Sequence, residues 1–198
     1  AQGAPVLAVS LDGGIAIFTY RRPARKIYEI YDQLAMAAIG QQSDVEMLRV
    51  AALEFAHQEG YNRSEQDVTI QRVVNALTAS IKRSFADFSY SPVVARALFA
   101  ELGQRPEDDN FTILDFDGDY STFKGSAVVA GDGDLSERLQ GLLSGEPWLG
   151  MSPENATTRL QEIWRSVREE GDPAEGLEPE AALLERNALR ASRFRVLL

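Results

Sequence analysis

The chain has 198 residues, a hydrophobic content of 44%, a charged content of 25% and a formal net charge of −10. It is long enough to form one domain with a sizeable core, and its acidity argues against nucleic acid and anionic membrane surfaces as partners, because both are bound by clustered lysine and arginine. The absence of cysteine excludes disulfides, thiolate metal sites and a cysteine nucleophile, and no apolar run approaches the roughly 20 residues of a membrane span.

Four short strands are predicted at the beginning of the chain. Val6–Ser10 and Ile15–Thr19 are nearly continuous apolar runs, which are typical of strands buried on both faces. Asp12-Gly13 between them favours a tight hairpin, because this pair tolerates positive φ values. Lys26–Tyr31 and Leu34–Ile39 are separated by only two residues and predict a second hairpin.

Two helices are predicted next, each opened by a capping signal. Ser43-Asp-Val-Glu46 and Ser64-Glu-Gln-Asp67 place a serine three residues before an acid, an arrangement in which each side chain satisfies the other residue's backbone N–H. Gly60 fits the C-terminal stop of the first helix. Apolar residues follow at helical spacing, at Val45, Leu48, Ala52 and Phe55 in the first helix and at Ile70, Val73, Val74, Leu77 and Ile81 in the second.

The rest of the chain repeats the block of strands followed by helices. Strands are predicted at Val93–Leu102, Phe111–Phe116, Thr122–Ala130, Pro179–Glu185 and Arg193–Leu198. A helix is predicted near Asp134–Leu143, and another is opened by Ser152-Pro153-Glu154, which supplies an N-cap, a first-turn proline and an early acid. This blocked order favours an α+β fold of layered sheets and helices over a parallel βαβ series.

The run Arg25–Tyr31, followed by the strand Leu34–Ile39 and Gly40, resembles the proteasome subunit family. The likeness covers most of the chain and is similar in particular to bacterial, actinobacterial-type α subunits. Its further segments are Arg21-Arg22 after the first hairpin, His57–Tyr61, Asp67–Thr69, Phe111–Ala130 and Leu177–Phe194. The resemblance implies the four-layer αββα sandwich of the N-terminal-nucleophile hydrolases, as a single proteasome-type domain over residues 1–198.

The residues that a proteolytic β subunit of this family needs are missing. Such a subunit uses a threonine whose own α-amine acts as the base. The resemblance over Leu11–Arg22 places Ala4 at that position, and Tyr20 where the catalytic site has an acid. Thr19 and Ser10 lie inside predicted strands and cannot present a free amine. The resemblance therefore implies a subunit that is not itself an enzyme.

In α subunits of the family, a lysine between neighbouring subunits receives the C-terminal carboxylate of an activator ATPase. Lys26 matches this lysine, and Gly40 and Gln41 match the positions that wall the pocket. The implied partners are proteasome β-type subunits, further α subunits in a seven-membered ring, and the C-termini of an AAA+ regulatory ATPase. No cofactor, metal, nucleic acid or membrane is implied, and the expected location is the cytoplasm. Family α subunits carry a gating tail before the first strand; few residues precede it here, so no gate residues are assigned.

Two other interpretations remain open. One is a divergent proteasome homologue that assembles by itself in another role. The other is a magnesium-dependent phosphatase, because Ile113–Asp119 resembles the haloacid-dehalogenase signature, with Asp115 as nucleophile and with both Asp115 and Asp117 helping to hold the metal. A hairpin turn is the structural alternative for the same residues. His57 is the only histidine and, without a partner histidine or cysteine, predicts a structural role on a helix face.

Overall fold

The computed structural model describes residues 3–86, 92–167 and 176–198, and within these ranges two antiparallel sheets of five strands face each other. The first sheet has the order β10 (Phe194–Val196), β9 (Glu178–Glu185), β2 (Gly14–Arg21), β1 (Val6–Leu11) and β8 (Ser126–Val129). The second has the order β3 (Ile27–Tyr31), β4 (Leu34–Gly40), β5 (Ala95–Glu101), β6 (Asn110–Leu114) and β7 (Tyr120–Phe123).

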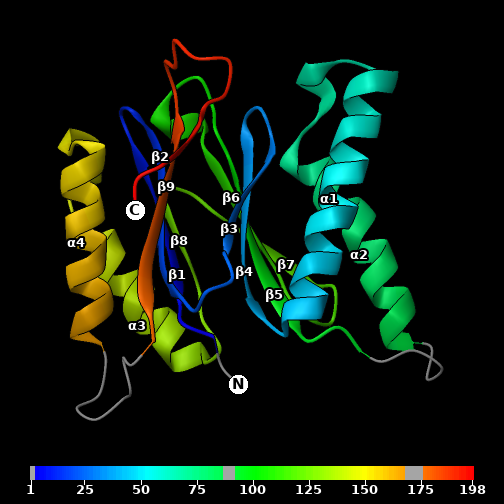
Figure 1. The fold of residues 1–198 in the computed structure, drawn as a ribbon, viewed down its shortest axis with the longest axis horizontal. Helices are drawn as coiled ribbons and strands as arrows, with labels where there is room; N and C mark the ends of the chain where they lie inside the picture. Colours follow the sequence, from blue (N-terminus) through cyan, green and yellow to red (C-terminus); the bar gives the residue numbers. More distant parts are fainter. Residues whose placement is uncertain (1–2, 87–91, 168–175) are drawn as a thin grey trace.

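A pair of helices covers the outer face of each sheet (Figure 1). The helices α3 (Gly133–Ser144) and α4 (Pro153–Ser166) lie on the first sheet, and α1 (Gln42–Asn62) and α2 (Ile70–Ala86) lie on the second. The predicted four-layer αββα sandwich is therefore confirmed. No helix among the described residues is long and apolar enough to span a membrane.

The core consists of three apolar layers, one between the sheets and one beneath each helix pair. Strand β1 shows why its sequence is apolar at every position. Val6 and Ala8 pack between the sheets, whereas Leu7 and Val9 pack against α3 and α4. All six residues of β1 are buried. The prediction that the first two runs are buried on both faces is thus confirmed, because alternate side chains enter different layers.

The starts of the helices α1 and α2 differ from the capping predictions. At α1 the N-cap residue is Gln41 and forms no side-chain cap; Ser43 lies inside the helix and contacts Asp44 instead. At α2 the segment around Ser64 forms only a short 3₁₀ turn. The helix begins at Ile70, whose N–H donates to Glu101 of β5 at 2.5 Å. The two serine signals are therefore wrong as helix caps, since tertiary contacts set where these helices begin.

Two further predictions needed correction. The helix α1 does not stop at Gly60 but continues to Asn62. A Cβ at Gly60 would lie 2.1 Å from the Tyr31 hydroxyl oxygen, so this glycine lets α1 approach β3 closely. The single strand predicted at 122–130 is two strands, β7 and β8, which belong to different sheets. The chain crosses between them at Gly125, whose φ of +77° favours glycine.

The capping prediction for α4 is confirmed, and α3 also begins with a side-chain cap. Ser152 accepts a hydrogen bond from the N–H of Asn155 at 3.2 Å, and Asp132 accepts one from Asp134 at 3.0 Å. The two tryptophans are buried packing anchors. The indole N–H of Trp164 donates to the Pro5 carbonyl at 3.2 Å, which joins α4 to the beginning of β1.

Candidate functional site

Lys26 lies immediately before β3 and directs its side chain across the gap between the sheets, to the start of the facing sheet. Its ammonium donates to the carbonyl of Ala4, to the hydroxyl of Thr19 at 3.0 Å and to the carbonyl of Tyr20 at 3.3 Å. A lysine ammonium has three donors. Each of them therefore has an uncharged oxygen partner, and the side chain is held in place where it is partly buried.

Thr19 links this lysine to the first strand. Its side chain is fully buried, and its hydroxyl donates to the Pro5 carbonyl at 2.8 Å while it accepts from Lys26. Thr19 was predicted only as a strand residue that cannot present a free amine. The structure adds that its hydroxyl is an acceptor for Lys26, a role that a single threonine in an apolar run does not reveal.

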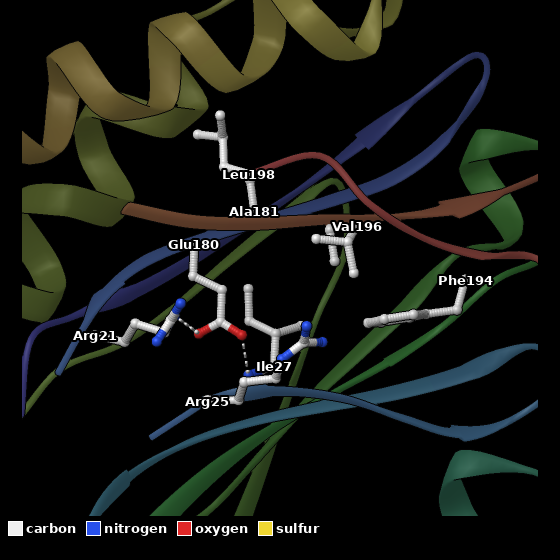
Figure 2. Close-up of a pocket in the computed structure, with 9 residues that line it drawn as sticks. Arg21, Arg25, Ile27, Glu180, Ala181, Phe194, Val196 and Leu198 are labelled. Atoms are coloured by element: carbon white, nitrogen blue, oxygen red, sulfur yellow. Dashed lines mark hydrogen bonds and ion pairs between the residues drawn. The ribbon is translucent and has the colours of Figure 1, made fainter. Parts of the chain in front are cut away.

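The main chain at Lys26 is held by a carboxylate from the other sheet. The Glu180 side chain on β9 accepts from the N–H of Lys26 at 2.9 Å and from the N–H of Ile27 at 3.3 Å. Figure 2 shows Glu180 between Arg21 and Ile27, in a shallow slot that is also lined by Arg25 and Phe194. Because side chains alternate along an extended chain, Arg25 and Ile27 face this slot while Lys26 points away from it.

Burial changes the protonation of Lys26. Desolvation lowers the pKa of its ammonium from 10.5 to about 7, and the negative charge of Glu180 opposes this shift. The lysine therefore titrates near neutral pH. It is fully charged only below that range, unless a further negative group arrives.

Gly40 and Gln41 lie at the same end of the second sheet. The N–H of Ala38, two residues before Gly40 on β4, donates to the Lys26 carbonyl at 3.3 Å. Gly40 has a φ of +132°, and a Cβ there would lie 2.2 Å from the Val94 carbonyl oxygen. The N–H of Gln41 donates to that same oxygen at 2.8 Å. The described hydrogen bonds connect neither residue to the Lys26 ammonium.

Ala4 and Tyr20, which the resemblance sets against catalytic positions of a β subunit, make structural contacts. Ala4 contributes only its carbonyl to Lys26. Tyr20 faces away from the lysine and into the layer beneath α4, where its hydroxyl accepts from Gln161 at 2.8 Å and from Arg165 at 3.1 Å. Its ring packs on Trp164 with centroids 4.3 Å apart. The contacts around Lys26 thus hold its ammonium in place, and the one hydroxyl among them, that of Thr19, donates to the Pro5 carbonyl.

The residues of the phosphatase alternative form the turn between β6 and β7. The N–H of Asp115 donates to the Asp119 carbonyl at 2.8 Å, and Asp115 pairs with Arg96 at 3.0 Å. Both sheets are antiparallel, whereas that signature opens a parallel, doubly wound sheet. No group of three possible metal ligands occurs within the described ranges. His57 lies on α1, with its ring 5.4 Å from that of Tyr31.

The fold is consistent with the sandwich of the proteasome and N-terminal-nucleophile hydrolase class, because two antiparallel sheets face each other between two pairs of helices. The proteasome subunit family model matches residues 2–170. The chain belongs to this family.

Several similar proteins are proteasome α subunits of actinobacteria. A proteasome subunit alpha from Xylanimonas cellulosilytica is 35% identical over 143 residues, which make up 70% of this chain and 58% of that protein. One from Sanguibacter keddieii is 33% identical over 181 residues, or 89% of this chain and 66% of that protein. One from Streptomyces coelicolor is 28% identical over 201 residues, or 98% of this chain and 77% of that protein. The match to the first two relatives thus spans less than two thirds of their length.

Proposed function

We propose that this chain is an α-type, non-catalytic subunit of a 20S proteasome core. In this role, one domain over residues 1–198 joins further α subunits in an outer ring, stacks on a ring of proteolytic β-type subunits and controls substrate entry. The observation that carries the proposal is the setting of Lys26, whose ammonium is held beside the carbonyl of Ala4, at the position where the resemblance implies the threonine of a proteolytic subunit. The α-type names of the relatives support it.

The partner-binding residues of the proposal are Lys26, Gly40 and Gln41. A carboxylate that reaches the Lys26 ammonium replaces one neutral oxygen partner by a charged one, and charge-assisted hydrogen bonds are the stronger kind. The incoming group is proposed to be the C-terminal carboxylate of an AAA+ regulatory ATPase in the cytoplasm. Weak contacts of single tails add up around a ring through multivalency.

Native mass spectrometry of the chain co-expressed with a β-type subunit from the same genome tests the architecture. The expected result is a large particle with equal numbers of both chains. A persistent monomer would contradict the proposal. A ring that contains only this chain would also contradict it, and would favour the divergent homologue that assembles by itself.

A further inference from the structure

We propose that Glu180, on the facing sheet, is the positioning residue of Lys26: it fixes the lysine's main chain and supplies the negative charge that acts on its ammonium. The inference rests on the proposed function in one respect, namely that Lys26 receives a carboxylate. Glu180 lies within the segment Leu177–Phe194 that carries part of the resemblance, but the resemblance implies no role for it.

Glu180 is a charged residue at an apolar position. On β9, Ala182 and Leu184 lie on the same side as Glu180, and both belong to the core between the sheets. Only 5% of Glu180 is exposed. A buried charge is costly, and an apolar residue of similar volume is often as stable or more stable. The carboxylate is explained by the two backbone N–H groups that it binds, because an apolar side chain would leave both without a partner.

The contacts of Glu180 converge on Lys26. Its two carboxylate oxygens accept from the consecutive N–H groups of Lys26 and Ile27, at the point where β3 begins. Figure 2 shows the contact with Ile27. Thr19 lies opposite Glu180 in the pairing of β2 with β9, and it accepts from the Lys26 ammonium. One cross-strand pair of the first sheet therefore holds the lysine at both ends, its backbone through Glu180 and its ammonium through Thr19.

Glu180 is the charged group that acts on the protonation of Lys26. From β2, Arg21 lies 4.0 Å from Glu180 and also pairs with the exposed Glu178 at 3.1 Å. The contacts from the start of the chain, from β2 and from β4 are the carbonyls and the hydroxyl already described and the N–H of Ala38. Desolvation lowers the pKa of Lys26, and Glu180 is the charge that counters it. Without Glu180, the lysine becomes neutral at a lower pH and loses its strength as a carboxylate receptor.

The sequence makes a direct measurement possible, because it contains only three lysines, Lys26, Lys82 and Lys124. NMR of the full chain with ¹³C-labelled lysine side chains resolves three titrations, and a Lys26→Arg variant assigns one of them. In Glu180→Gln, the pKa of Lys26 is expected to fall by about one unit, a typical effect of removing a nearby opposite charge. Lys82 serves as the internal reference, since it pairs with Asp119 on the surface.

Glu178→Gln is the matched control. It removes the same charge from the same strand and the same arginine partner, but at a side chain that is 67% exposed. The pKa of Lys26 is expected to stay unchanged in this variant. Equal titration of Lys26 in Glu180→Gln and in the unaltered chain would overturn the inference. If Glu180→Gln does not fold, Glu180→Asp is the second variant. It keeps the negative charge but shortens the side chain that reaches the two N–H groups. The Lys26 resonance is then expected to change its chemical shift, while the pKa of Lys26 stays within about half a unit of its value in the unaltered chain. An unchanged resonance would overturn the inference.

Binding of a short peptide with a free C-terminal carboxylate, compared with its C-terminal amide, separates this inference from the proposed function. The expected result is that the pH of half-maximal binding falls in Glu180→Gln by the same amount as the pKa of Lys26. If the pKa moves in that variant but Lys26→Met leaves peptide affinity unchanged, then Glu180 still positions Lys26 and the proposed receptor function fails.

Discussion

At the scale of single residues, the function proposed for this chain depends on one ammonium group with neutral partners. Lys26 donates to two carbonyls and one hydroxyl, and none of these oxygens is charged. The group is therefore held in position without being neutralised by direct contact. Its counterion Glu180 binds the backbone N–H instead, which leaves the ammonium open to exchange one of its partners.

Lys26→Ala is expected to weaken the binding of an activator's C-terminal peptide at least about tenfold per site. A charge-assisted hydrogen bond contributes roughly 1.5–3 kcal/mol, and 1.4 kcal/mol corresponds to a decade. Isothermal titration calorimetry with a monovalent peptide measures the single site without the multivalency of a ring. Lys82→Ala is the control, because Lys82 lies on α2 and its side chain is 55% exposed. Equal affinities of the two variants would exclude Lys26 as the receptor.

The pH dependence of stability gives a second test of Lys26. Between about pH 7 and pH 10.5, the unfolded chain holds a proton on this lysine that the folded chain has released, because burial lowers its pKa in the folded state. The contribution of Lys26 to the free energy of unfolding therefore increases as the pH rises through this interval and decreases as the pH falls toward 7. Its slope is at most about 1.4 kcal/mol per pH unit.

Lys26→Met is expected to remove this part of the slope. Denaturant unfolding of both proteins at pH 7, 8 and 9 measures the difference between the slopes. Lys82→Met is expected to leave the slope unchanged in this range, because hydrogen bonding to Asp119 raises the pKa of Lys82. Parallel curves for Lys26→Met and the unaltered chain would show that the lysine keeps its proton in the folded state.

At the scale of elements, two serines with similar local sequence have different roles. Ser152 caps α4 by accepting from Asn155, whereas Ser43 lies inside α1 and caps nothing. At the start of α1, Asp44 instead accepts from the N–H of Val94 at 2.7 Å and joins the helix to the approach of β5. Both serines precede an acid in the first turn of a helix, Asp44 or Glu154, but only Ser152 stands at the N-cap position.

Ser152→Ala is expected to cost about 1 kcal/mol of stability, the usual value of a lost N-cap. Ser43→Ala is expected to change stability by less than about 0.5 kcal/mol, as surface substitutions away from caps do. Thermal unfolding of the two variants compares them directly. A loss at Ser43 as large as that at Ser152 would show that the first serine does act as a cap.

The sequence predicts the elements better than it predicts the contacts of the site. Periodicity placed every described strand and helix near its observed position, because apolar alternation reports which face is buried. It could not separate β7 from β8, since the small residues around Gly125 continue the strand pattern while the chain changes sheets. Lys26 was identified through resemblance. Glu180 lies 154 residues from Lys26, and its only sequence signal is an acid at the start of an apolar strand.

At the scale of the whole molecule, a buried ion pair joins the two sheets. Arg186, directly after β9, forms two hydrogen bonds of 2.8 Å with Asp109 before β6, and their side chains are 6% and 0% exposed. The guanidinium also donates to the carbonyls of Leu11, Asp12 and Gly103. Its donors thus connect the β1–β2 turn of one sheet with the β5–β6 loop of the other.

Arg186→Met is expected to destabilise the protein by about 3–5 kcal/mol, because it leaves the carboxylate of Asp109 buried without its partner. Arg190→Met is the control and is expected to cost at most about 1 kcal/mol, since its pair with Glu185 is partly exposed. Urea unfolding measures both. A small loss at Arg186 would mean that water reaches Asp109 and replaces the guanidinium.

The strand β9 carries a polar cross-link to the opposite sheet at each end, Glu180 near its beginning and Arg186 just beyond its last residue. Hydrogen bonds depend on direction more strongly than apolar contacts do, so these two cross-links fix the position of the sheets relative to each other at both ends of β9.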